Sequence, residues 1–389
     1  MGTGEASVRA GADTRHQSSS ISPVPPDAIR DDLLQRAARL VPVLRERAAR
    51  TEQLRQIPPE TVKDLVASGL LRIGNPERYG GVGVDIDTGH AVAWELGRGC
   101  GSTAWCASLW VVHNWWLGHF TEQAQEEFFA TGPDTAAPRR ASIPPTAGPS
   151  PCPAAFACSG RWSFSSGCDA ATWAMLAVLG PASGTLRWLL IPRARLRDRR
   201  HVVRLGHARH GQQGHRGRRR VRPRAPPARS GSRGRPRAHR VGAAPAARAI
   251  ACRCGSCSGW DLAAPLVGVA QGAVDEFTAR LQGTSGPGRT ADSVPLQLRL
   301  AEASAEVDAA RTIHRAAHPG DARPGGGGRE FTELRSRSLS PRQGLRHAAV
   351  RQAVNRLFEA GGAGAIADSQ ALQRFHRDVH AASHHAALG

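Results

Sequence analysis

An arginine-rich tract from Arg197 to Arg240 limits what this chain can fold into more than any other sequence feature. It holds 16 arginines and one acidic residue, Asp198, so it contributes +15 of the net charge of +20. Glycine and proline are scattered through it, and neither the helical nor the strand period can be found in it. We therefore expect no regular core within the tract, and look for cores on either side of it.

A positive charge of this size usually points to nucleic acid or to an anionic surface. This tract contains no lysine, because Lys63 is the only one in the chain, and no Phe, Tyr or Trp. Nucleic-acid sites commonly mix lysine with arginine and often add aromatic side chains. We therefore expect no nucleic-acid partner. An arginine-rich nucleic-acid binder stays as an alternative, which a steep salt dependence of DNA binding would support.

The flanking segments carry the periodic patterns that the tract lacks. Apolar residues at helical spacing predict helices over 27–56, 90–98, 102–120, 122–130, 262–282 and 295–317, and a last helix from Val350. Pro58 and Pro59 predict a further helix start, because proline is tolerated in a first turn. Alternating β-forming residues over 160–164 and 173–191 predict strands.

This order predicts an α+β fold in four parts. We expect a disordered N-terminus over 1–26, a helical domain over 27–139, a disrupted β domain over 140–255 and a helical bundle over 256–389, with irregular inserts near 316–347. No run of 18 apolar residues occurs, so no membrane span is expected, and the polar N-terminus predicts a cytoplasmic protein. Cys252, Cys254 and Cys257 are too few for a typical four-ligand zinc site, so we expect no metal.

Several segments resemble the acyl-CoA dehydrogenase fold, and in particular its two-component, flavin-dependent aromatic hydroxylase branch. The resemblance rests on Tyr79-Gly80-Gly81 with Asp85, on the run from Gly99 to Trp105, and on the segments 159–168 and 372–384. Together these matches extend over about three quarters of the chain. The resemblance implies an N-terminal helical domain, a middle β domain and a C-terminal helical bundle.

The arginine-rich tract also fits a gene read out of frame. The codons that 206–216 permit, read one nucleotide later, allow a glycine-rich turn that begins Gly-Met-Arg-Gly-Thr-Gly, and 199–205, 220–227, 154–158 and 335–346 can be reread similarly. We therefore predict compensating frameshifts, with 195–255 out of frame. A coding sequence that cannot be reread in this way would contradict the hypothesis.

The resemblance also implies the site residues. Catalysis in this branch uses reduced flavin (FMN or FAD) and dioxygen to place one oxygen atom on a phenol ring. We predict His113 and His384 as catalytic residues facing one cavity, with His385 a less favoured substitute for His384. Trp162, Ser165, Ser166 and Arg289 are predicted to contact the flavin. Without the resemblance, His113 would be read as a core histidine and Arg289 as a solvated arginine.

We therefore predict a flavin-dependent monooxygenase that hydroxylates a small aromatic substrate. The resemblance implies two protein partners, a flavin reductase that supplies reduced flavin and further copies of the chain in a homotetramer. One alternative is an acyl-CoA dehydrogenase acting on CH–CH groups, but residues 381–388 contain no carboxylate to serve as the usual base. A further alternative is a frameshifted product without function.

Overall fold

The computed structural model describes residues 25–118, 120–134, 139–140, 150–152, 155–157, 161–179, 186–195, 198–199, 213–216, 239–240, 245–283, 292–316 and 333–385. Side chains are described at 25–118, 120–134, 165–176, 190–194, 262–283, 292–316 and 344–385. Most of the arginine-rich tract, the cysteine side chains of 252–257, and Arg289 lie outside these ranges.

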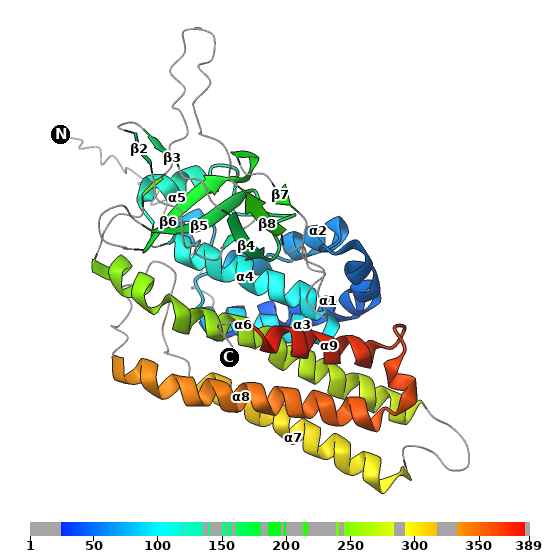
Figure 1. Cartoon of the computed structure of the whole chain (residues 1–389). Coiled ribbons are helices and arrows are strands. Elements are labelled where there is room, and N and C mark those ends of the chain that lie inside the picture. The colour runs from blue at the N-terminus through cyan, green and yellow to red at the C-terminus, as the bar shows by residue number, and fades with distance from the viewer. Residues whose placement is uncertain are drawn as a thin grey trace, which may run out of the picture.

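The N-terminal part consists of helices packed around α4. Its helices are α1 (Pro26–Leu54), α2 (Pro59–Ala67), α3 (Ile86–Gly99), α4 (Gly101–Leu117) and α5 (Glu122–Phe129), with 3₁₀ turns at Leu70–Gly74 and Glu77–Tyr79. Prolines occupy the starts of α1 and α2, where their missing N–H groups leave no helical bond unmade. α4 lies between the strands and the other helices (Figure 1) and is buried along nearly its whole length, which explains why its sequence is apolar all round.

The strands form a separate layer beside α4 and α5 (Figure 1). One sheet has the order β1-β5-β6-β9 and another β4-β8-β7, while β2 and β3 form a hairpin. Among the described strands, all pairs are antiparallel except β1 with β5. The strands are β1 (Arg139–Arg140), β2 (Ser150–Cys152), β3 (Ala155–Ala157), β4 (Arg161–Ser165), β5 (Trp173–Leu179), β6 (Leu186–Pro192), β7 (Asp198–Arg199), β8 (Gln213–Arg216) and β9 (His239–Arg240).

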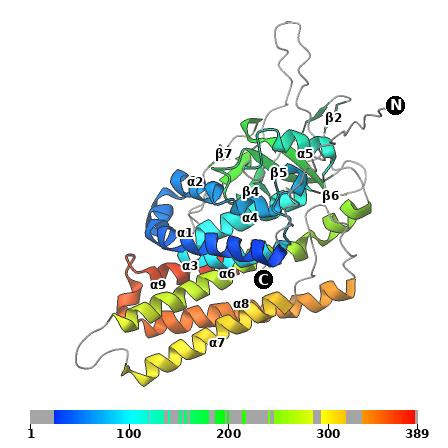
Figure 2. The same cartoon turned by 180° about the vertical axis from the view of Figure 1, so that it is seen from behind.

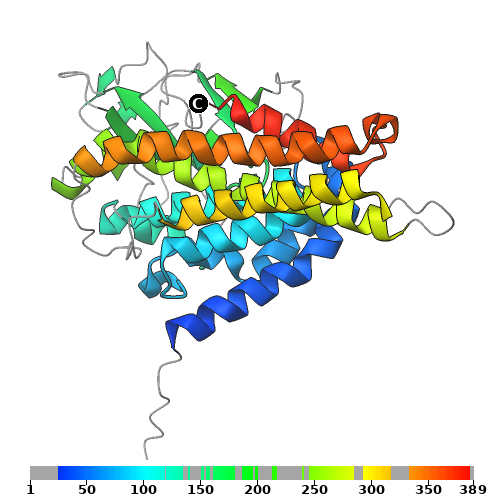
Figure 3. The same cartoon turned by 90° about the horizontal axis from the view of Figure 1, so that it is seen from below.

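The C-terminal part is again helical. It contains α6 (Pro245–Gln282), α7 (Val294–Ala316), α8 (Glu333–Ala360), a 3₁₀ turn at Ala363–Ile366, and α9 (Ala371–Ser383). α7 and α8 lie side by side on the outside of the bundle (Figure 3). α6 begins within the stretch that the sequence assigns to the β domain, and α8 begins within the predicted irregular insert at 316–347. None of the helices, within the described residues, is long and apolar enough to cross a membrane.

The two helical parts pack directly on each other where α3 crosses α6, with α1 on the far side of α3 (Figure 2). A Cβ on Gly268 would lie 2.1 Å from the carbonyl oxygen of Trp94, and one on Gly97 would lie 2.6 Å from that of Pro265. Only glycine allows helix backbones to come this close. Beside the crossing, Arg98 Nε donates to Asp275 Oδ2 at 2.8 Å. The β layer therefore sits against a continuous helical body.

Candidate active site

α4 supplies the inner wall of the candidate site, where the turn after β4 packs against it. Trp105 Nε1 donates to Ser166 Oγ at 3.2 Å, and Trp110 Nε1 donates to the carbonyl of Gly167 at 3.2 Å. Gly167 has a φ of +72°, and a Cβ there would lie 2.8 Å from Trp110 Nε1. The turn thus needs glycine both for its left-handed conformation and for its contact with the indole.

Ser165 ends β4 and Ser166 begins the turn, and both residues are buried. Ser166 accepts the bond from Trp105, whereas Ser165 Oγ finds no hydrogen-bond partner in the part of the chain that the structure describes. Buried hydroxyls are nearly always bonded, so Ser165 Oγ is a candidate contact for a bound polar group. The residues present therefore fit the polar edge of a flavin ring.

The end of α9 supplies the opposite wall. The ring of His385 meets the ring of Trp105 edge-on, with centroids 5.7 Å apart. His384, the predicted catalytic residue, is exposed and forms the C-cap of α9. The structure thus brings His385 to the Trp105–Ser166 pair, while the side chain of His384 is turned toward solvent.

His113 lies further along α4 and is 3 % exposed. Its ring meets that of Trp116 edge-on at 6.3 Å. Eight residues of helix separate it from Trp105, which is about 12 Å along the axis. The next residue, Asn114, anchors this part of α4 because its Nδ2 donates to Asn75 Oδ1 at 2.7 Å. His113 is thus buried along α4, whereas His384 is exposed at the end of α9.

Trp162 and Arg289, two of the predicted flavin contacts, have side chains outside the described residues. Trp162 belongs to β4, where its backbone pairs with His215 of β8, but its side chain lies outside the described set. Arg289 lies outside the described residues altogether. Sequence reasoning did not single out the contact of Trp105 with His385. The sequence feature that could have indicated this contact is the pair of adjacent histidines after the last apolar residue of α9, because only one of the two side chains can face inward.

Two buried groups near α4 have strongly altered acidity. Burial raises the pKa of the Cys106 thiol well above its ordinary value, so Cys106 remains a neutral thiol and is no nucleophile. Burial also raises the pKa of Asp378, on α9, to about 7, although Arg374 and Arg377 act against it. No group of metal-ligating side chains occurs among the described residues.

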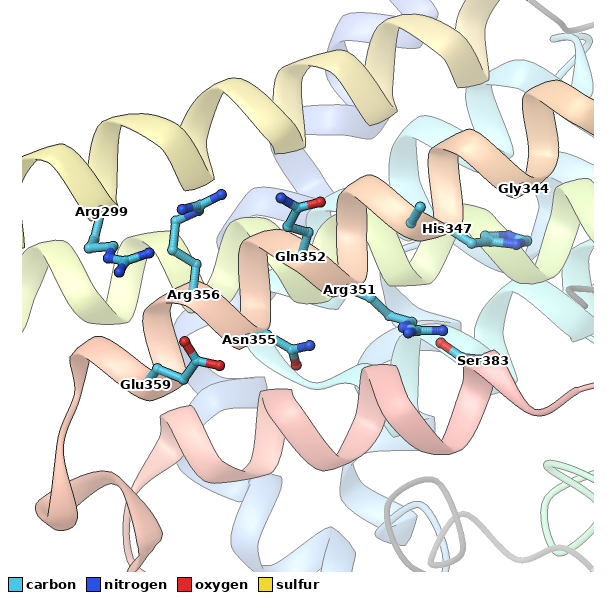
Figure 4. Close-up of a pocket in the computed structure, with 10 residues that line it drawn as sticks. Arg299, Gly344, His347, Arg351, Gln352, Asn355, Arg356, Glu359 and Ser383 are labelled. Atoms are coloured by element: carbon cyan, nitrogen blue, oxygen red, sulfur yellow. The ribbon is translucent and has the colours of Figure 1, made fainter.

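A groove of about 640 Å³ runs beside α8 (Figure 4). Arg299 of α7 contributes at one end, and Arg351 points toward Ser383 of α9 at the other. None of the predicted site residues lines it, so this groove is separate from the Trp105–Ser166–His385 cluster. Its lining residues are Arg299, Gly344, His347, Ala348, Arg351, Gln352, Asn355, Arg356, Glu359 and Ser383.

A helical domain, a β layer and a helical bundle, with a polar cluster where the three meet, define an acyl-CoA dehydrogenase-like flavoprotein. The family described as "Acyl-CoA dehydrogenase, N-terminal domain" matches residues 28–131, and "Acyl-CoA dehydrogenase, C-terminal domain" matches 261–389. The chain is 32% identical to the flavin-dependent monooxygenase oxygenase subunit HsaA of Rhodococcus jostii, over 91% of this chain and 94% of the relative.

Two further comparisons agree. The crystal structure of 3-HSA hydroxylase from Rhodococcus sp. RHA1 is similar with a TM-score of 0.77 at 28% identity, over 92% of this chain and 93% of that one. The oxygenase component of an FADH2-dependent resorcinol hydroxylase from Rhizobium sp. is 30% identical over 44% of this chain and 43% of its own length. The chain belongs to the acyl-CoA dehydrogenase family, in the branch of two-component flavin-dependent monooxygenases.

Proposed function

We propose that this chain is the oxygenase component of a two-component system that hydroxylates a phenolic ring, using reduced flavin from a partner reductase. The observation that carries the proposal is the imidazole of His385 packed against Trp105, where the end of α9 offers no carboxylate. A dehydrogenase of this fold needs a carboxylate base at that end, so the site favours work on a phenol over α-proton removal from a thioester.

The residues of the cluster divide the work. Bound reduced flavin supplies the activation of dioxygen and the oxygen atom that is transferred. Ser165 and Ser166 hold the polar edge of the ring system through their hydroxyls, with Trp162 and Arg289 as further contacts. Trp105 and Trp110 wall the site with apolar surface that keeps water out.

His385 takes the phenolic proton in this proposal. An imidazole has an ordinary pKa close to neutrality, so its neutral form can accept that proton near physiological pH. Removing the proton makes the ring carbon beside the hydroxyl more electron-rich, which favours attack on an electrophilic oxygen. In this proposal His385 takes the role that the sequence predicted for the exposed His384, and His113 stays a predicted catalytic residue of the substrate site.

The test is a hydroxylation assay of the full chain with excess flavin, a flavin reductase, NADH and a panel of phenols. We expect a catechol-type product, and no dehydrogenation of acyl-CoA substrates assayed in parallel. His385→Ala should abolish product, whereas His384→Ala, the matched control one residue away, should keep most of it. If only His384→Ala lost the hydroxylated product, the proton acceptor would be His384. Dehydrogenation of acyl-CoA without any hydroxylation would reject the proposed hydroxylase function.

We also propose that the chain assembles as a homotetramer through the outer face of α7 and α8. Val294 and Leu298 are 61% and 59% exposed on α7, and Leu345 is 63% exposed on α8, so each of these two helices presents large apolar side chains to solvent. Replacing Leu298 and Leu345 with glutamine should reduce the mass measured by light scattering to that of a smaller assembly. An unchanged mass would place the contact elsewhere.

A further inference from the structure

The contact between α9 and α4 has two points, and only one of them belongs to the cluster described above. His385 touches Trp105, while Asp378 touches Gly101. His385 follows Asp378 by seven residues and Trp105 follows Gly101 by four, so each pair lies on one face of its helix or of that helix's continuation. The two contacts therefore mark a single seam between the helices.

The carboxyl group of Asp378 is fitted closely against the start of α4. Asp378 is 5 % exposed, and a Cβ placed on Gly101 would lie 2.7 Å from its Oδ2. The N-cap of α4, Cys100, provides no side-chain hydrogen bond to the first turn. The unbonded N–H groups of that turn carry partial positive charge, which an adjacent carboxylate complements.

Charged side chains hold the other side of α9. Arg377 Nη1 lies 2.6 Å from Glu52 Oε1 of α1, and Arg374 Nε lies 3.7 Å from Glu52 Oε2. The side chains of Arg374, Arg377 and Glu52 are 14%, 13% and 17% exposed, so the group is largely shielded from solvent. On the remaining side, Val269 of α6 faces Gly101 and brings no charge.

We propose that Asp378 is a positioning residue for the hydroxylation reaction: its carboxyl group fixes α9 against the first turn of α4, and thereby holds the His385 ring against Trp105. The inference rests on the proposed function for its catalytic meaning. The structural part of the inference, that the position of His385 depends on Asp378, holds whether or not the proposed function is correct.

Substitutions at Asp378 separate charge from shape. Asp378→Asn keeps the size of the side chain and removes its charge, whereas Asp378→Glu adds a methylene where Gly101 leaves no room. The matched control is Asp368→Asn, which alters an exposed carboxylate just before α9. We expect the control to behave like the unchanged chain in every measurement.

The first measurement needs no activity. The His385 ring proton resonances, assigned through their loss in His385→Ala, carry a ring-current shift from Trp105. Asp378→Asn should move them toward the values of an exposed histidine, and Asp378→Glu should move them at least as far. Unmoved resonances in both variants, with the chain still folded by circular dichroism, would overturn the proposal.

The second measurement is the yield of hydroxylated product per NADH consumed. Asp378→Asn should lower this coupling and kcat about tenfold while leaving KM for the phenol within a factor of about two. In a His385→Ala background it should have no further effect, because two residues acting through one step are not additive. If the losses of coupling and kcat in the two single variants added up in the double variant, Asp378 would not act through His385. Shifted resonances in a chain without hydroxylase activity would retain the positioning role and reject the proposed function.

Discussion

The buried carboxyl of Asp378 gives a prediction for stability that requires no knowledge of the reaction. Burial raises its pKa in the folded chain from 3.8 to about 7, against the opposing charges of Arg374 and Arg377. A raised folded-state pKa means that this group's contribution is fully present below the unfolded pKa and is lost as the pH rises through the folded one. The unchanged chain should therefore lose stability from about pH 4 to about pH 7, and a comparison of pH 5 with pH 8 samples most of this loss.

The size of the loss follows from the same pKa. Each pH unit between about 5 and the folded-state pKa costs about 1.4 kcal/mol, which gives about 3 kcal/mol over this part of the range. The partial positive charge at the first turn of α4 favours the carboxylate and offsets about 1 kcal/mol of this. We expect a net loss of about 2 kcal/mol from this one group.

Urea unfolding at both pH values provides the assay. The free energy of unfolding of the unchanged chain should fall by about 2 kcal/mol more than that of Asp378→Asn, which has no charge to gain. Asp368→Asn, whose carboxylate is exposed, should follow the unchanged chain. Parallel pH curves for the unchanged chain and Asp378→Asn would refute the account of the buried carboxyl.

Three further predictions concern the seam and the cofactor. Gly101→Ala should lower the free energy of unfolding by about 1–3 kcal/mol in urea titrations, because its Cβ would overlap Asp378 and Val269; an unaffected variant would show that the seam is loose. Trp110→Phe removes the donor to the Gly167 carbonyl, so it should cost about 1–2 kcal/mol in the same titrations and weaken flavin binding measured by fluorescence. The chain as written should purify colourless and bind flavin weakly, whereas the gene reread in one frame should bind it tightly, since glycines of the family's turn allow close backbone approach; a stoichiometric, tightly bound flavin in the chain as written would contradict the frameshift hypothesis.

The helices could be predicted because their signals are local. Pro58 and Pro59 place the start of α2, and the apolar run after Ser102 indicates a buried α4, as the structure has it. The first turns of α6 could not be predicted, since 245–261 adjoins the arginine-rich tract and shows no clear apolar period. The backbone of 245–261 is nevertheless helical, as the first part of α6, whose later part packs on α3.

The site was less predictable because it depends on contacts between distant segments. The choice between His384 and His385 turns on where α9 ends, and helix ends are the least certain feature of a sequence pattern. Asp378 lies in the segment 372–384 that carries the resemblance, but no local pattern predicts its contact with Gly101, which lies far away in the sequence. His113, Ser165 and Ser166 are placed in or beside buried structure, and their roles stay predictions.

The crossing of α3 and α6 has a consequence for how this chain reaches its native state. Arg98 and Asp275 are 177 residues apart in sequence, so the two helical parts can join only after the whole intervening segment has closed into a loop. The entropy of such a closure grows slowly, by about 0.6 kcal/mol for each doubling of loop length. Insertions, deletions or rewritten stretches in the loop therefore change the closure very little. A pair of compensating frameshifts that rewrote only the middle of such a gene would therefore leave both helical parts, and the closure that joins them, intact.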